Sequence, residues 1–145
     1  MEGLSVRVIG AGVIFAIIGQ LIHNLGSIPT MGFYTDPQYF NVWSKVMMPT
    51  AGPPPMSFLY YSIIFGMITG ILLAFVYAII QGGVPWAGTK KGLIYGFLVF
   101  LVAGVPGSLS LYLLVNLPST LIAYWALENL GIYLLGGAIF GRLIQ

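Results

Sequence analysis

The chain contains no cysteine and very little charge. Only 6% of its 145 residues are charged, whereas soluble domains carry about 25%. Without cysteine, the chain itself cannot supply disulfides, thiolate metal sites, iron–sulfur clusters or thiol catalysis. The net charge of +2 is too small for nucleic-acid binding, which needs clustered lysine and arginine. With 59% hydrophobic residues, this composition cannot build a soluble surface and indicates a membrane protein.

Four apolar stretches are each long enough to cross a membrane as a helix. About 20 apolar residues cover a ~30 Å hydrocarbon core, and the spans are predicted at residues 5–25, 56–81, 91–117 and 119–143 of a single membrane domain, 1–145. Arg7 and the apolar run behind it have the shape of a signal peptide. No small-residue cleavage site follows, so we expect a retained first span. The predicted fold class is all-α, a polytopic transmembrane bundle of four helices.

Two features interrupt this simple pattern. Gly104-Val-Pro-Gly107 lies inside the third span, and proline in a helix removes a hydrogen bond and kinks the chain. One kinked span is favoured, and a short helix followed by a half-helix over 108–117 stays open. The second feature is the aromatic-rich segment 36–48 between spans one and two, where Asp36 suits an N-cap and Pro37 the first helical position. It predicts an interfacial amphipathic helix, with a packed lid as the alternative.

The basic residues are unevenly distributed between the two sides of the predicted bundle. One side holds four of the five, namely Arg7, Lys90, Lys91 and Arg142, and the other side holds Lys45. The positive-inside rule therefore places both termini in the cytoplasm, with the protein in the plasma membrane.

Small residues recur at four-residue spacing along the spans. In lipid, close backbone approach through small residues contributes to helix association. The second span and the fourth span carry the residues of this predicted helix-packing interface: Gly66, Gly70, Ala74, Ala78, Gly137 and Gly141. For the second span, packing within the chain and contact with another copy or subunit are equally favoured.

Glu128 lies near the middle of the apolar run 121–143, in a chain with only three acidic residues. An ionised, unpaired carboxylate at membrane depth costs from about 3 to more than 10 kcal/mol, so Glu128 needs a partner, a proton or a cavity. His23 shares a helix face with Gln20 and Asn24, and histidine exchanges protons near neutral pH. The candidate ligand or proton site comprises Glu128, His23, Gln20, Tyr124, Asn24, Asn129 and Asn116. The plain alternative is hydrogen bonding between helices with Glu128 protonated.

Catalytic and cofactor signatures are missing from the sequence. It has no Ser-His-Asp set, no glycine-rich phosphate loop and no paired carboxylates, so no catalytic residue is predicted and an enzyme is not expected. A b-type haem usually needs two axial histidines and the chain has one. A metal bound by His23 and Glu128 would lack a third ligand. Neither a cofactor nor a metal is therefore expected.

Several glycine and proline positions carry a resemblance. Lys91-Gly-Leu-Ile-Tyr-Gly96, the Gly104–Gly107 break, Asn116-Leu-Pro118 and the approach from Trp43 to Pro53-Pro-Pro55 are together similar to uncharacterised small four-span membrane proteins of bacteria and archaea. The resemblance covers most of the chain. It implies the four-span topology and no activity.

Two functions remain open at this point. The favoured one is a non-enzymatic structural or accessory subunit that assembles laterally in the lipid bilayer, as a homo-oligomer or with other membrane subunits. The alternative is a small transporter or channel with an outward-facing polar pocket centred on Glu128 and a small molecule or ion as its ligand. The small-residue ladder motivates the first, and the intramembrane carboxylate motivates the second.

Overall fold

The computed structural model describes residues 2–145, which are helical in the main and contain no strand. The elements are α1 (Glu2–Thr35), the 3-10 helix η1 (Pro37–Val42), α2 (Met56–Ile80), the 3-10 turn η2 (Gln81–Gly83), α3 (Gly88–Val99), the π-helical η3 (Phe100–Gly104), α4 (Val105–Leu114) and α5 (Ser119–Leu143). Four helical stretches are long and apolar enough to cross a membrane: Gly3–Thr35, Met56–Gly83, Gly88–Leu114 and Ser119–Leu143. The predicted all-α set of four spans is therefore confirmed.

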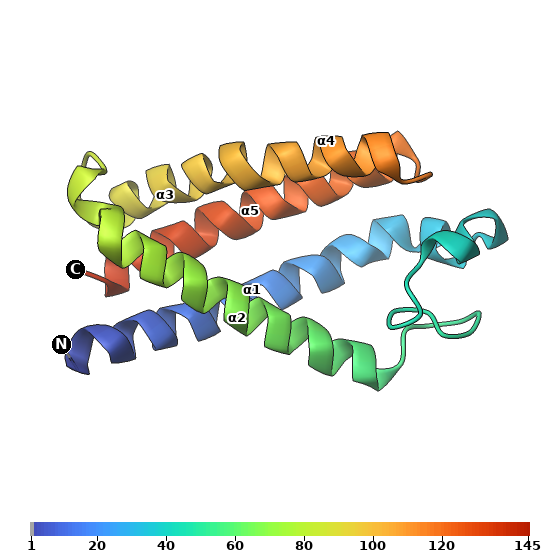
Figure 1. The fold of residues 1–145 in the computed structure, drawn as a ribbon, viewed down its shortest axis with the longest axis horizontal. Coiled ribbons are helices and arrows are strands. Elements are labelled where there is room, and N and C mark those ends of the chain that lie inside the picture. The colour runs from blue at the N-terminus through green and yellow to red at the C-terminus, as the bar shows by residue number, and fades with distance from the viewer. Residues whose placement is uncertain (1) are drawn as a thin grey trace.

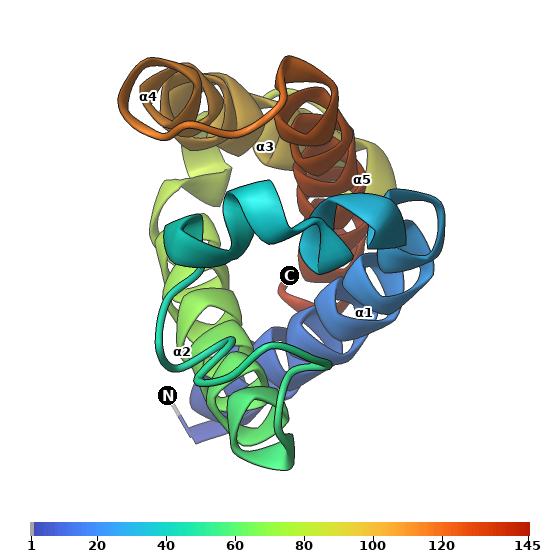
Figure 2. The same cartoon turned by 90° about the vertical axis from the view of Figure 1, so that its right-hand side faces the viewer.

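The four spans form two helix pairs. In Figure 1, α3 and α4 run beside α5, and α1 crosses α2 below them. The start of α1 and the end of α5 lie at one end of the molecule, together with the connection between α2 and α3. We call this the basic end, because Arg7, Lys90 and Arg142 belong to it. The opposite end carries residues 36–55, which cross between the helices in Figure 2, and we call it the aromatic end.

The third span is one helix with a widened turn. α3 passes through the π-helical η3 into α4 without a break in the chain of helical residues. Pro106 has no backbone N–H to donate, and the π-helical turn Phe100–Gly104 directly precedes the turn that contains it. π-helical hydrogen bonding occurs mostly as single turns inside α-helices, as it does here. The structure thus has the single span, and the half-helix alternative does not form.

The first helix continues well past the predicted span end at residue 25. It runs through Pro29 to Thr35. Around the proline, the Ser27 hydroxyl donates to the Asn24 carbonyl (2.8 Å) and the Thr30 hydroxyl donates to the Gly26 carbonyl (2.9 Å). Serine and threonine hydroxyls commonly satisfy the carbonyls near a proline in membrane helices. The carbonyl that the missing proline N–H leaves without a helical donor is that of Leu25, four residues earlier, and these two bonds are made at the carbonyls on either side of it.

The contact between α3 and α5 is made by glycines. A Cβ added at Gly92 would collide with the Gly137 carbonyl, and a Cβ at Gly141 would collide with the Gly88 carbonyl. A Cβ at Gly96 would strike the Tyr133 carbonyl in the same way. The two backbones therefore touch directly, which only glycine permits.

The ladder on α2 faces α1 within the same chain. A Cβ at Gly70 would meet the Gly12 carbonyl, and a Cβ at Gly66 would sit 3.4 Å from the Ala16 side chain. Ala74 is fully buried, and Ala78 is packed against the buried core. Of the two packing partners left open by the sequence, the structure thus uses this face inside the chain.

The hydrophobic core lies toward the basic end. Tyr77, Tyr95 and Phe140, from three different helices, are almost fully buried and pack against one another with tilted or edge-on rings, whose centroids are 5.2 to 6.3 Å apart. The Tyr95 hydroxyl donates to the Leu73 carbonyl of α2 at 2.8 Å. This bond joins the α3–α5 pair to the α1–α2 pair.

The predicted amphipathic helix over 36–48 does not form. Asp36 does cap a helix, accepting from the Gln38 amide at 3.0 Å, but this helix is the six-residue η1. The chain then turns, and Trp43 and Met48 both pack with Leu121 of α5. In a straight α-helix, residues five apart lie on different faces, so the turn lets both side chains be buried. The segment is the packed lid that the sequence left as the alternative.

Candidate functional site

His23 and Glu128, which lie 105 positions apart in the sequence, meet between α1 and α5. The His23 Nδ1 is 2.8 Å from the Glu128 Oε2. The His23 side chain is 51% exposed, whereas that of Glu128 is 10% exposed. The carboxyl group is thus held inside the helix packing, and the imidazole joins it to the surface of the bundle.

Gly26 makes room for the carboxyl group. A Cβ at this position would overlap the Glu128 Oε1 and lie 2.5 Å from its Cδ. The Glu128 side chain therefore rests on the backbone of α1, one turn after His23. Any side chain at position 26 would displace it. Gly26 was not among the predicted site residues, although its place three residues after His23 puts it on the same helix face.

The pair lies at membrane depth in the half of the bundle nearer the aromatic end. His23 follows Arg7 by 16 residues, which is about 24 Å along a helix axis. Glu128 precedes Arg142 by 14 residues, or about 21 Å. An ionisable pair at this depth is rare in membrane proteins and most often marks an ion or substrate pathway or a proton relay.

A second polar contact lies beside the pair and ties α1 to α2. The Gln20 amide donates to the Asn24 side chain at 3.1 Å, and the Ser62 hydroxyl of α2 donates to the Gln20 side-chain oxygen at 2.9 Å. Polar side chains from α1, α2 and α5 are therefore in contact near one level. Ser62 was not among the candidates, and its polar character in the same half of the second span is the signal that points to it.

Three predicted site residues are not joined to the pair. Tyr124 is 44% exposed, Asn116 is exposed beyond the end of α4, and Asn129 is half-buried beside Glu128 in the sequence. Within residues 2–145, no hydrogen bond links their side chains to His23 or Glu128. Of the seven candidates, the structure assembles Glu128 with His23, and Gln20 with Asn24.

An aromatic cluster covers the site at the aromatic end. Trp43 of the lid packs against Tyr34 of α1 and Trp125 of α5, with centroid separations of 5.1 and 6.2 Å. The Trp125 indole donates to the Tyr34 hydroxyl at 2.9 Å. Trp125 precedes Glu128 by one helical turn, so the cluster lies directly beyond the pair. The buried Trp43 Nε1 has no hydrogen-bond partner among the described residues.

The described residues offer little for a metal. No group of three His, Asp, Glu or Cys side chains lies together within the part of the chain that the structure describes. The pair supplies one nitrogen and one carboxylate. What this arrangement can do chemically is hold a proton, or bind a cation in competition with the imidazole.

No protein-family model, curated protein or solved structure matches the chain. The function therefore has to be inferred from the geometry of the site.

Proposed function

We propose that the protein is a small membrane transporter or channel in which the His23–Glu128 pair binds a proton or a small cation. One observation carries the proposal: a carboxyl group nine-tenths buried at membrane depth, 2.8 Å from the imidazole of another span. Proton exchange on either partner changes the charge at a place where charge is expensive. In this proposal the half-exposed imidazole is the group through which the buried carboxyl group exchanges its proton or cation.

The packing of α2 bears on the alternative, a lateral assembly subunit. That expectation drew on the ladder of small residues on α2. Gly66 and Gly70 pack on α1 of the same chain, and Ala74 is fully buried. Because the ladder packs on α1 in this structure, it gives no support of its own to lateral assembly.

The proposed direction of exchange follows from the charge distribution. We place the basic end in the cytoplasm by the positive-inside rule, so His23 and Glu128 lie in the outer half of a plasma-membrane protein. From the pair to the basic end, the interior is filled by the buried aromatic side chains Phe15, Tyr77, Tyr95 and Phe140. Passage to the cytoplasm requires this core to open. The π-helical turn Phe100–Gly104 follows Val99, a residue of this core, and departs from the α-helical hydrogen-bonding pattern, as turns at functional sites often do.

A flux measurement tests this proposal. The purified protein is reconstituted in liposomes loaded with a pH-sensitive dye, and a potassium diffusion potential drives proton entry; sodium and potassium uptake are measured in parallel. We expect the wild type to conduct one of these ions. We expect Glu128→Gln to reduce that flux to the level of empty liposomes, because the amide cannot hold the proton or the cation.

The matched control is Asp36→Asn, which makes the same chemical change at the lid. Asparagine caps helices about as well as aspartate, so this variant should conduct like the wild type. Circular dichroism and gel filtration confirm that both variants are folded. A folded Glu128→Gln protein with undiminished flux, or a wild type that passes none of these ions, would contradict the proposal.

A further inference from the structure

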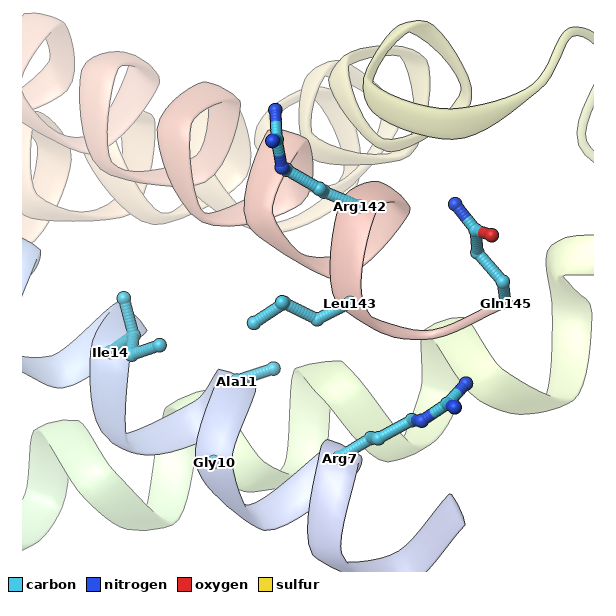
Figure 3. A pocket seen from close by; sticks show the side chains of 7 residues that line it. All are labelled: Arg7, Gly10, Ala11, Ile14, Arg142, Leu143 and Gln145. Atoms are coloured by element: carbon cyan, nitrogen blue, oxygen red, sulfur yellow. The ribbon is translucent and has the colours of Figure 1, made fainter. Parts of the chain in front are cut away.

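A cleft opens at the basic end, far from the His23–Glu128 pair. It lies between the start of α1 and the end of α5 and has a volume of about 420 Å³. Figure 3 shows its lining residues: Arg7, Gly10, Ala11, Ile14, Arg142, Leu143 and Gln145. The two arginines and the glutamine amide form its polar part. Ala11, Ile14 and Leu143 form its apolar part; Ala11 is buried, whereas Ile14 and Leu143 are partly exposed.

The two arginines have no acidic partner in the described structure. Of the acidic side chains that the structure describes, Glu128 is paired with His23, and Asp36 lies at the aromatic end, where it caps η1. No salt bridge within the described residues involves Arg7 or Arg142. Two unpaired guanidinium groups beside one cleft attract a negative charge, and arginine is well suited to bind phosphate oxygens in pairs.

The position of the cleft selects the kind of anion. It lies at the ends of two helices that are long and apolar enough to cross a membrane, where we expect phospholipid headgroups to meet the hydrocarbon. Basic pockets between transmembrane helices at this level are suited to anionic headgroups. The apolar part of the cleft lies next to the arginines, where the first methylenes of an acyl chain would run.

We propose that this cleft binds the phosphate of an anionic phospholipid headgroup. In the structure the two guanidinium groups point in different directions: Arg7 extends toward the Gln145 side of the cleft, and Arg142 rises away from it (Figure 3). A bound phosphate draws both arginines toward it, and in doing so links the first helix to the last. The site is separate from the His23–Glu128 pair, so its test does not depend on ion flux.

Native mass spectrometry of the protein titrated with phosphatidylglycerol or phosphatidylcholine tests the site. We expect the wild type to retain phosphatidylglycerol preferentially. We expect the double variant Arg7→Gln/Arg142→Gln to lose roughly 25-fold in phosphatidylglycerol affinity, because each arginine near an anionic membrane surface contributes about a factor of five. The matched control is Lys90→Gln, which removes a positive charge from the same end but outside the cleft, where Lys90 lies 3.4 Å from the Trp86 ring centroid.

Further arms of the experiment separate the possible outcomes. The proposal would be overturned if the double variant kept its affinity for phosphatidylglycerol, or if Lys90→Gln lost as much affinity as the double variant. It would also be overturned if the wild type showed no preference for phosphatidylglycerol over phosphatidylcholine and no response to phosphate. Inorganic phosphate, added without lipid, distinguishes the source. Thermal stabilisation by phosphate that depends on both arginines, without lipid retention, supports the same phosphate chemistry with a soluble ligand. If the double variant does not fold, Arg7→Lys and Arg142→Lys keep the charge and should lose affinity only through the lost paired hydrogen bonds.

Discussion

Gly92→Ala should destabilise the bundle more than a single added methyl group usually does. The new Cβ would collide with the Gly137 carbonyl oxygen and would lie 2.7 Å from the carbonyl carbon of Gly137 and 2.8 Å from the amide nitrogen of Gly141. Ordinary carbon contacts are about 3.5–4.0 Å, so the α3 and α5 backbones must separate by roughly 1 Å.

The expected cost follows from what surrounds the new methyl group. Overpacking a core usually costs about 1–3 kcal/mol, depending on how well neighbouring side chains can move away. Here the three nearest atoms all belong to the backbone of α5. None of them can turn aside by changing a rotamer. We therefore expect a loss of about 3 kcal/mol, at the upper end of this range.

The same span provides a matched control. A Cβ at Gly107 of α4 would meet nothing within 4 Å, so Gly107→Ala should be neutral or gain up to about 1 kcal/mol from helix propensity. Both variants are unfolded in detergent micelles with increasing sodium dodecyl sulfate, and helicity and tryptophan fluorescence are followed. Equal midpoints for Gly92→Ala and Gly107→Ala would refute the direct backbone contact.

Two further predictions concern the lid and the core. Trp43→Ala removes the aromatic side chain that holds the lid against Tyr34 and Trp125, so we expect trypsin to cleave after the exposed Lys45 at least severalfold faster than in the wild type; an unchanged rate would show that the lid is held elsewhere. Tyr95→Phe removes the hydroxyl that donates to the Leu73 carbonyl. We expect it to lower the unfolding free energy by about 1 kcal/mol, whereas Tyr112→Phe, at an exposed position, should leave stability unchanged in the same assay.

The sequence predicted the spans well, because the length of an apolar run directly reflects the thickness of the membrane. Counting residues along each helix also placed His23 and Glu128 in the same half of the bundle, and the structure brings these two side chains together. It could not identify which helix faces meet. The small residues on α2 have the same spacing whether they face Gly12 of the same chain or another protein, and only the packed structure shows the partner.

The lid shows why the remaining details escaped the sequence. The aromatic residues of segment 36–48 fit one face of a helix, and that pattern predicted a regular element. The structure instead buries Trp43 and Met48 around Leu121, which belongs to a helix more than 70 residues later in the chain. Such long-range packing outweighs a weak local helical preference. The contact of His23 with Glu128 is of the same kind: each residue was a candidate, and their meeting is a property of the fold.

The length of α1 also relates the protein to the bilayer around it. Tyr34 follows Arg7 by 27 residues, or about 40 Å along the helix axis, which matches a bilayer including its headgroup regions, about 40–45 Å thick. Tyrosine and tryptophan are enriched at both membrane interfaces, and arginine is enriched on the cytoplasmic side. In a thinner bilayer, α1 would be longer than the membrane is thick, and tilting of α1 would relieve this difference in length. Because α1 carries His23 and crosses α2 at Gly12, membrane thickness acts directly on the helix that holds half of the polar pair.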